Sequence, residues 1–94
     1  MITAIVLINT ARTRVNDVAD ALGRVAGVSE IYSVGGRFDL VAMIRVTDHD
    51  ALAEVVTADI ARVEGIERTE TLIAYRSLSR HDLEAMFSIG MQGS

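Results

Sequence analysis

An internal repeat is the feature of this 94-residue chain that most limits its fold. Shifted by 38 residues without a gap, residues 2–6 align with 40–44, and residues 24–28 align with 62–66. Each copy contains an apolar segment, a helix-like stripe, a glycine and a second segment. Two copies are too few for a solenoid, which needs three or more repeats. We therefore expect one pseudo-symmetric α+β domain of ferredoxin-like βαββαβ topology.

Composition restricts the class of protein. Half the residues are apolar, yet no apolar run reaches the roughly 18 residues of a membrane helix. The first segment lacks the features of a signal peptide, so we expect a cytoplasmic protein that does not bind membranes. The chain has no cysteine, which removes disulfides and thiolate chemistry. Its net charge is −4 and its 9 basic residues are scattered arginines, which disfavours direct binding to nucleic acid.

The first copy predicts a strand, a helix and a second strand. Residues 2–9 are almost wholly apolar, as in a strand buried on both faces. A helix follows, capped by Thr13 or Asn16, and Gly27 ends it in a left-handed conformation. Residues 28–34 then alternate as a strand does. The apolar stripe of the helix consists of Val15, Val18, Ala19, Leu22 and Val25.

The second copy repeats this order. Gly35 and Gly36 predict a two-residue hairpin that leads into a strand over residues 38–46, with Phe38 on the same face as its neighbour Leu40. The acidic segment 48–50 is typical of a capped helix start rather than of a metal site. The stripe of the second helix consists of Leu52, Val55, Val56, Ile60 and Val63, and the last strand covers residues 66–78.

The chain divides into a domain over residues 1–78 and a C-terminal extension over residues 79–94. In the extension, a polar Ser-Arg-His-Asp start precedes the apolar residues Leu83, Met86 and Phe87. This pattern predicts a short helix over residues 80–88.

The predicted sheet has one bare face. Two helices on one face of a four-stranded antiparallel sheet leave the other face uncovered, and much of that face is apolar. Each large aliphatic side chain left in water forgoes about 1.5–3 kcal/mol, which is large against the marginal stability of a small domain. We therefore expect a homodimer, sheet against sheet, that forms a dimeric α+β barrel.

Two segments resemble a known family. Residues 34–39, Val-Gly-Gly-Arg-Phe-Asp, resemble the Gly-x-x-Asp hairpin of the Lrp/AsnC effector-binding domain, also called the RAM domain. Residues 63–73 resemble its closing strand, with a glycine turn and paired threonines. The resemblance covers residues 1 to about 78 and is to the stand-alone form without a helix-turn-helix. One departure is Gly35, since a threonine or serine commonly stands there.

This resemblance implies sheet-to-sheet dimers, often assembled into rings of dimers, with amino acids bound at the contacts between dimers. It implies a non-enzymatic module that acts in transcriptional regulation or amino-acid metabolism through assembly, including assembly with full-length regulators of the family.

The leading candidate site is the segment Gly36 to Asp39. An amino-acid effector presents an ammonium and a carboxylate. The Asp39 carboxylate can accept from the ammonium, the backbone N–H groups of the glycine turn can donate, and Arg37 can pair with the carboxylate. The alternative is a tight hairpin flanked by solvated charges.

Three further residues are weaker candidates. Thr69 and Thr71 share a strand face and can offer hydroxyl groups to a ligand, or they are β-branched residues of a solvated strand. Tyr32 lies next to the hairpin and can wall the same site or pack in an interface.

No pattern for a catalytic residue, a cofactor or a metal site is present. The alternative function is a small cofactor-free oxygenase or isomerase of the dimeric α+β barrel type. Such enzymes need a catalytic His, Asp or Tyr inside the barrel, whereas His49 and His81 fall at predicted helix starts. An ACT-like regulatory domain ranks lower, because residues 9–13 lack the glycine that often follows its first strand.

Overall fold

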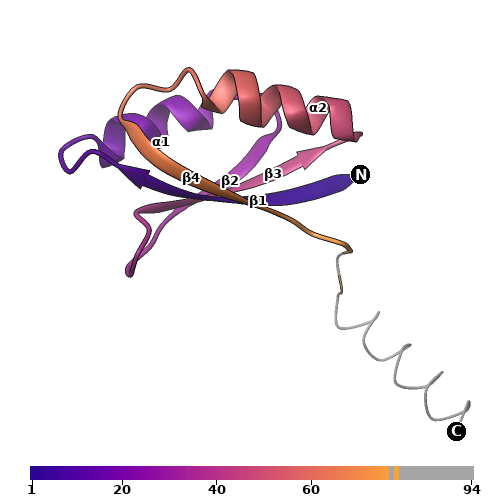
Figure 1. Ribbon diagram of the computed structural model, residues 1–94, viewed down its shortest axis with the longest axis horizontal. Coiled ribbons are helices and arrows are strands. Elements are labelled where there is room, and N and C mark those ends of the chain that lie inside the picture. Colours follow the sequence, from indigo (N-terminus) through magenta and orange to yellow (C-terminus); the bar gives the residue numbers. More distant parts are fainter. Residues whose placement is uncertain (77, 79–94) are drawn as a thin grey trace, which may run out of the picture.

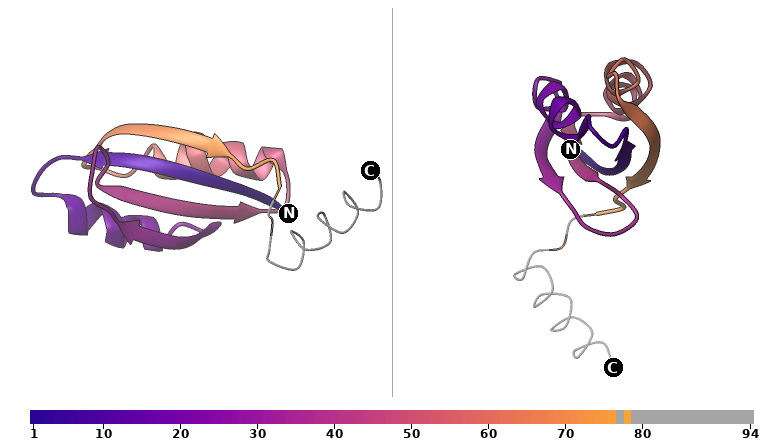
Figure 2. Two further views of the ribbon diagram at one scale, coloured as in Figure 1. Left: turned by 90° about the horizontal axis from the view of Figure 1, so that it is seen from below. Right: turned by 90° about the vertical axis from the view of Figure 1, so that its left-hand side faces the viewer.

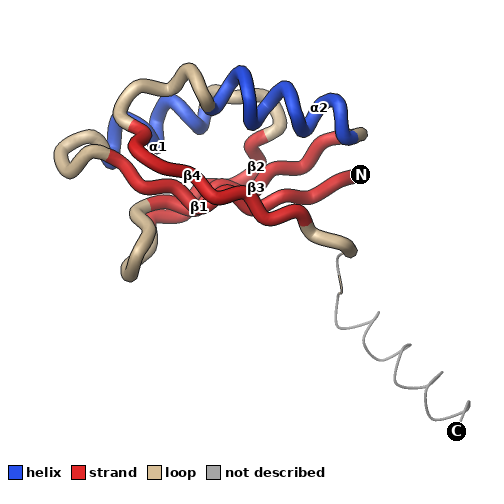
Figure 3. The backbone as a smooth tube through the Cα atoms, in the orientation of Figure 1, coloured by secondary structure: helices blue, strands red, loops and turns tan. Residues whose placement is uncertain are grey.

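The protein is described by a computed structural model that covers residues 1–76 and 78. Four antiparallel strands form one sheet in the order β2-β3-β1-β4, and the helices cover one of its faces (Figure 1, Figure 3). This is the predicted ferredoxin-like α+β fold. No helix in the described part is long and apolar enough to span a membrane. The elements are β1 (Ile2–Thr10), α1 (Val15–Gly23), β2 (Val28–Ser33), β3 (Leu40–Val46), α2 (His49–Glu54), the π-helical segment η1 (Val55–Ile60) and β4 (Ile66–Ile73).

The core lies between the helices and the two central strands. Alternate residues of β1 and β3 face the helices because side chains of a strand alternate between its two faces. The predicted helical stripes are confirmed, with their remaining members packed against the core as partly buried residues. The buried residues are Ala4, Val6, Ile8, Leu40, Ala42, Ile44 and Val46 from the strands, and Val18, Leu22, Leu52, Val55 and Ile60 from the helices.

The helix starts follow different rules in the two copies. The carboxylate of Asp48 accepts from the N–H of Ala51 at 2.8 Å, which confirms the predicted cap of the second helix. The predicted cap of α1 is wrong, because Arg14 stands at that position and makes no side-chain capping bond. Its guanidinium instead pairs with Asp17 in the first turn, at 3.1 Å.

The first helix is also shorter than predicted. It ends at Gly23, and the N–H groups of Val25 and Val28 then bond the carbonyls of Leu22 and Val25 in consecutive turns. Gly27 has the predicted left-handed conformation, with φ of 96°, but it lies in this turn and not directly at the helix end.

Two left-handed glycines, Gly27 and Gly65, interlock the two copies of the repeat. A Cβ atom at Gly27 would lie 3.1 Å from Cγ2 of Val55, which belongs to the second copy. At Gly65, which has φ of 97°, a Cβ atom would lie 2.9 Å from Cγ2 of Val18 in the first copy. At these two positions the backbone of each copy therefore lies against the helix of the other copy. The distance leaves no space for a Cβ atom, so only glycine fits.

The connection between β2 and β3 is longer than the predicted two-residue hairpin. The strands stop at Ser33 and start again at Leu40, so residues 34–39 form a loop, which we call the β2–β3 loop. It projects from the side of the sheet opposite the helices (Figure 1). Phe38 is therefore not part of β3, contrary to the prediction that it shares a face with Leu40.

The last strand ends earlier than predicted, at Ile73 instead of Leu78. Ile73 pairs with Ala4, and the N–H of Ala74 donates to the carbonyl of Thr3 at 2.9 Å, close to the start of β1. The helix predicted over residues 80–88 lies outside the described residues.

The face of the sheet opposite the helices, which we call the open face, is not covered by any element of residues 1–76 and 78 (Figure 2). Directly paired residues of neighbouring strands share a face, so Ile5 with its partners Met43 and Leu72 points away from the helices. Leu72 is 46% exposed. The open face is thus partly apolar, as the sequence predicts.

Candidate functional site

Asp39 fastens the β2–β3 loop to β1 and closes the loop on itself. Its backbone N–H donates to the carbonyl of Ile8 at 2.9 Å, and its own carbonyl accepts from the N–H of Val34 at 3.0 Å. Its carboxylate oxygen Oδ2 accepts from the backbone N–H of Thr10 at 2.9 Å. The two bonds to β1 stand where a longer β3 would continue its ladder with β1. The carboxylate that the sequence assigns to a ligand therefore already has a structural partner.

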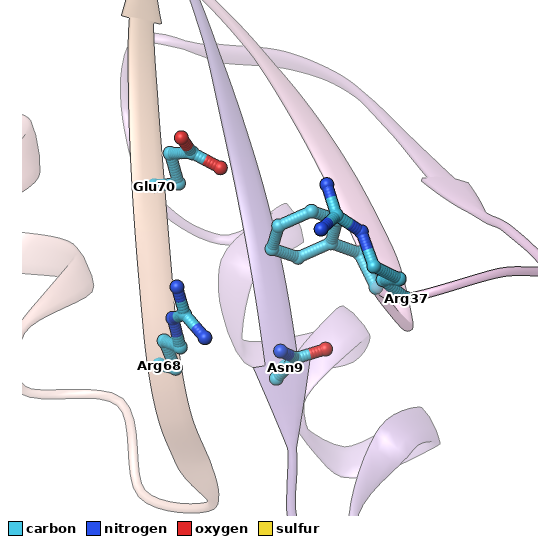
Figure 4. Close-up of a pocket in the computed structure, with 5 residues that line it drawn as sticks. Asn9, Arg37, Arg68 and Glu70 are labelled. Carbon is cyan, nitrogen blue, oxygen red and sulfur yellow. The ribbon is translucent and has the colours of Figure 1, made fainter.

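The loop borders a cleft of about 170 Å³ on the open face. Arg68 of β4 pairs directly with Asn9 of β1, and Glu70 of β4 pairs with Leu7 of β1. Both charged side chains therefore project from the open face. Figure 4 shows Arg68 and Glu70 extending from β4 toward β1, with Arg37 on the other side of β1. The residues that line the cleft are Asn9, Arg37, Phe38, Arg68 and Glu70.

The charged side chains of the cleft make no ion pair with any residue in the described part of the chain. Arg37 and Arg68 contribute two positive charges and Glu70 one negative charge, which leaves the cleft with a net positive charge. A guanidinium presents a planar fork of donors that matches a carboxylate, and a carboxylate accepts from an ammonium. The cleft therefore offers partners for both ends of a zwitterion.

Tyr32 lies on the open face of β2 but belongs to a separate polar cluster. Its hydroxyl donates to the carboxylate of Glu30, which also accepts from the guanidinium of Arg45 at 2.8 Å. The bonds from Tyr32 and Arg45 lower the pKa of the Glu30 carboxyl, and the bond to Glu30 raises the pKa of the Tyr32 hydroxyl. Tyr32 does not line the cleft.

The two threonines lie on the opposite face from the cleft. Thr69 pairs with Ile8 and Thr71 with Val6, whose side chains point into the core. Thr71 borders an apolar groove of about 250 Å³ between β4 and the second helix, where His49 also lies. The structure thus brings Arg37 to the cleft, with Gly36 next to it in the loop, and separates Arg37 from both threonines.

Sequence reasoning missed four residues that line the cleft: Asn9, Phe38, Arg68 and Glu70. Arg68 and Glu70 alternate with Thr69 and Thr71, and Leu72 and Ile73, which continue the two rows, are both apolar, so the sequence held no signal that separates the two pairs. The pairing with β1 places Arg68, Glu70 and Leu72 on the open face. Within residues 1–76 and 78, no three His, Cys or carboxylate residues are placed to hold a metal ion.

Comparison with known proteins identifies similar domains. Residues 3–83 match the family model of the Lrp/AsnC ligand binding domain. Protein TTHA0845 from Thermus thermophilus has 48% identity and a TM-score of 0.80, and the match covers 85% of this chain and 100% of that one. An uncharacterized HTH-type transcriptional regulator from Pyrococcus horikoshii, PH1916, is 25% identical over 59 residues, which are 63% of this chain and 39% of the regulator. The matched part thus spans about two fifths of that regulator.

The fold is shared with a more distant regulator as well. The transcriptional regulator NMB0573 from Neisseria meningitidis, solved as a complex with L-Met, has a TM-score of 0.74 at 15% identity. The match covers 84% of this chain and 53% of that one. At this identity the likeness concerns the fold alone.

Proposed function

Because this chain belongs to the Lrp/AsnC ligand-binding domain family, we propose that it is an effector-binding regulatory module of the cytoplasm. The family is that of the ligand-binding domains of transcriptional regulators and not a family of enzymes. The effector in this proposal is an amino acid, and the module acts by assembling with copies of itself or with full-length regulators.

The observation that carries this proposal is the set of charged side chains at the cleft without ion-pair partners in the described residues. Arg37 or Arg68 can bind the carboxylate of an amino acid, and Glu70 can accept from its ammonium. The cleft volume of about 170 Å³ is below the roughly 300–1,000 Å³ of pockets that hold drug-sized ligands, so the cleft suits a ligand as small as one amino acid. The L-Met bound to the Neisseria regulator supports the same ligand class.

The β2–β3 loop is the part of the site that the sequence and the structure have in common. Gly36 has φ of 109°, which turns the loop tip, and Arg37 follows it directly into the cleft. Asp39 acts in this proposal as a positioning residue, because its carboxylate holds the loop on Thr10. We leave Thr69 and Thr71 out of the cleft, since they face the helices.

Assembly in this proposal uses the open face. A second copy that covers the face removes apolar side chains from water, at about 25 cal/mol per Å² of apolar surface. The cleft lies on the same face, so a ligand there can favour one assembly over another if it binds that assembly more tightly. Light scattering is expected to give the mass of a dimer or a multiple of it at micromolar concentration. A monomeric mass would contradict the assembly proposal.

Ligand binding is tested by thermal shift of the full chain against the twenty amino acids. We expect at least one to raise the melting temperature, because a ligand at about 100 times its Kd adds about 2.7 kcal/mol. R37Q is expected to abolish the shift. The matched control is R62Q, since Arg62 lies outside the cleft and approaches Asp59 only at 3.9 Å. No shift with any amino acid, or an equal shift in R37Q, would refute the proposed site.

A further inference from the structure

We infer that the cleft accepts an amino dicarboxylic acid, glutamate or aspartate, in preference to amino acids with uncharged side chains. This inference rests on the proposed function, because it names the class of effector that the same cleft would take. It follows from the number of charges at the cleft and from the neutral residue that stands opposite Arg68 on β1.

The charges of the cleft exceed those of a simple zwitterion. An amino acid with an uncharged side chain brings one carboxylate and one ammonium, which pair with one guanidinium and with Glu70. The second guanidinium then has no carboxylate. A second carboxylate on the ligand supplies the missing partner, and a ligand with one excess negative charge meets a cleft with one excess positive charge.

Some arginines of the described residues have an ion-pair partner, and others, among them Arg12 and Arg76, have none. Arg24 pairs with Asp20 at 2.9 Å, and Arg45 pairs with Glu30 at 2.8 Å. Arg14 likewise pairs with an acid in the first turn of α1. Arg68, by contrast, stands directly opposite the neutral amide of Asn9. An acid at that cross-strand position would have compensated its charge.

The arrangement of the side chains fixes which group of the ligand each would hold. Arg68 and Glu70 are two residues apart on β4, so their attachment points are about 7 Å apart on one face. In Figure 4 the Glu70 carboxylate and the Arg37 guanidinium lie at one end of the cleft, on either side of β1, and the Arg68 side chain lies at the other end, beside Asn9. Glu70 and Arg37 thus hold the α-ammonium and α-carboxylate, and Arg68 holds the carboxylate of the side chain.

The cleft also limits the size of the ligand. Its volume of about 170 Å³ suits one amino acid rather than a peptide or a nucleotide. Phe38 and Asn9 are the uncharged residues of its lining, so the charged groups determine the selectivity. Glutamate and aspartate differ from glutamine and asparagine only in that charge, which makes the amides matched probes.

Isothermal titration of the full chain tests the inference with L-Glu, L-Asp, L-Gln, L-Asn and L-Met. We expect at least roughly ten-fold tighter binding of each acid than of its amide, and a smaller difference at high salt because exposed charges are screened. R68Q is expected to weaken binding of the acids by about the same factor and so remove the preference. R62Q is expected to retain it, and a melting curve of each variant checks folding.

The possible results separate the inference from the proposed function. If an amide or L-Met binds as tightly as the acids, the dicarboxylate inference is wrong and the effector-binding function stands. The same holds if R68Q keeps the full preference for the acids. If none of these amino acids binds, the inference is wrong, and the screen of all twenty then decides the proposed function separately.

Discussion

The left-handed glycines of this domain occupy two unlike settings. Gly27 and Gly65 lie against the helix of the opposite copy, with 3.1 Å and 2.9 Å to the nearest side-chain atom from an added Cβ. Gly36 has a similar φ, but nothing lies within 4 Å of its added Cβ, and the same is true of Gly35. The first pair joins the two copies of the repeat, whereas the second pair lies in a loop that presents side chains. One residue type thus serves the scaffold in one place and the site in another.

Gly65→Ala is expected to produce the largest effect. An L-residue in the left-handed region costs about 1–2 kcal/mol, and overpacking against Val18 adds about 1–3 kcal/mol. We expect a loss of about 3 kcal/mol in the free energy of unfolding, measured by urea denaturation at fixed protein concentration. Gly27→Ala should lose somewhat less, because its contacts are longer. A loss below about 1 kcal/mol in both variants would show that the interlock is loose.

Asp39→Ala tests how firmly the β2–β3 loop is attached. It removes a charged acceptor and leaves the N–H of Thr10 without its bond, which costs about 1–3 kcal/mol. Amide hydrogen exchange is expected to become faster at Thr10. Asp39→Asn keeps an acceptor oxygen and should show a smaller change. Unchanged protection of the Thr10 amide in Asp39→Ala would argue against this attachment.

The two glycines of the loop tip, Gly35 and Gly36, provide a further test of the difference between the loop and the scaffold. Gly36→Ala is expected to lose about 1 kcal/mol, since it carries the left-handed cost without a steric clash. Gly35→Ala is expected to change stability by less than about 0.5 kcal/mol, as surface substitutions usually do. Thermal or urea denaturation of the two variants measures both values. A Gly36→Ala loss as large as that of Gly65→Ala would mean that the loop tip is as constrained as the scaffold.

The smallest expected effect concerns the polar cluster beside the loop. The hydroxyl of Tyr32 donates to Glu30, so the pKa of Tyr32 lies above its ordinary value. Its contribution to stability is therefore present below the unfolded pKa and is lost as the pH rises through the folded pKa. Ultraviolet titration should show this raised pKa in the wild type and a lower one in Glu30→Gln. Equal curves would show that the bond does not persist in solution.

The pKa of Glu30 changes in the opposite direction. Hydrogen bonds from Tyr32 and Arg45 lower it. The contribution of Glu30 is thus present above its unfolded pKa and is lost as the pH falls through the folded value. Both groups are on the surface, so we expect only a slight dependence of stability on pH.

Burial made most of the fold predictable. The apolar stripes of both helices and the alternation in β3 appear in the sequence because the same side chains must leave water. The ends of the elements were less predictable, since they depend on distant contacts. The bond from Thr10 to the carboxylate of Asp39, for example, takes the place of a ladder bond, so the loop extends to residue 39 and β3 begins later than the glycines suggest.

The site was predictable only in part for a related reason. Arg37 follows a recognisable glycine turn, so the sequence locates it. Along β4, strand alternation separates Arg68 and Glu70 from Thr69 and Thr71, but it does not say which pair faces the helices. Residues 67–71 are all polar and give no burial signal. Only the pairing of β4 with β1 decides the question.

The strand order has a consequence for how the protein is made. Of the four described strands β1 leaves the ribosome first, yet it lies between β3 and β4, and β4 is made last. At a synthesis rate of about 5–20 residues per second, several seconds pass between the synthesis of this apolar strand and that of the second of its two neighbours. During translation its apolar side chains therefore stay without their native neighbours for that time.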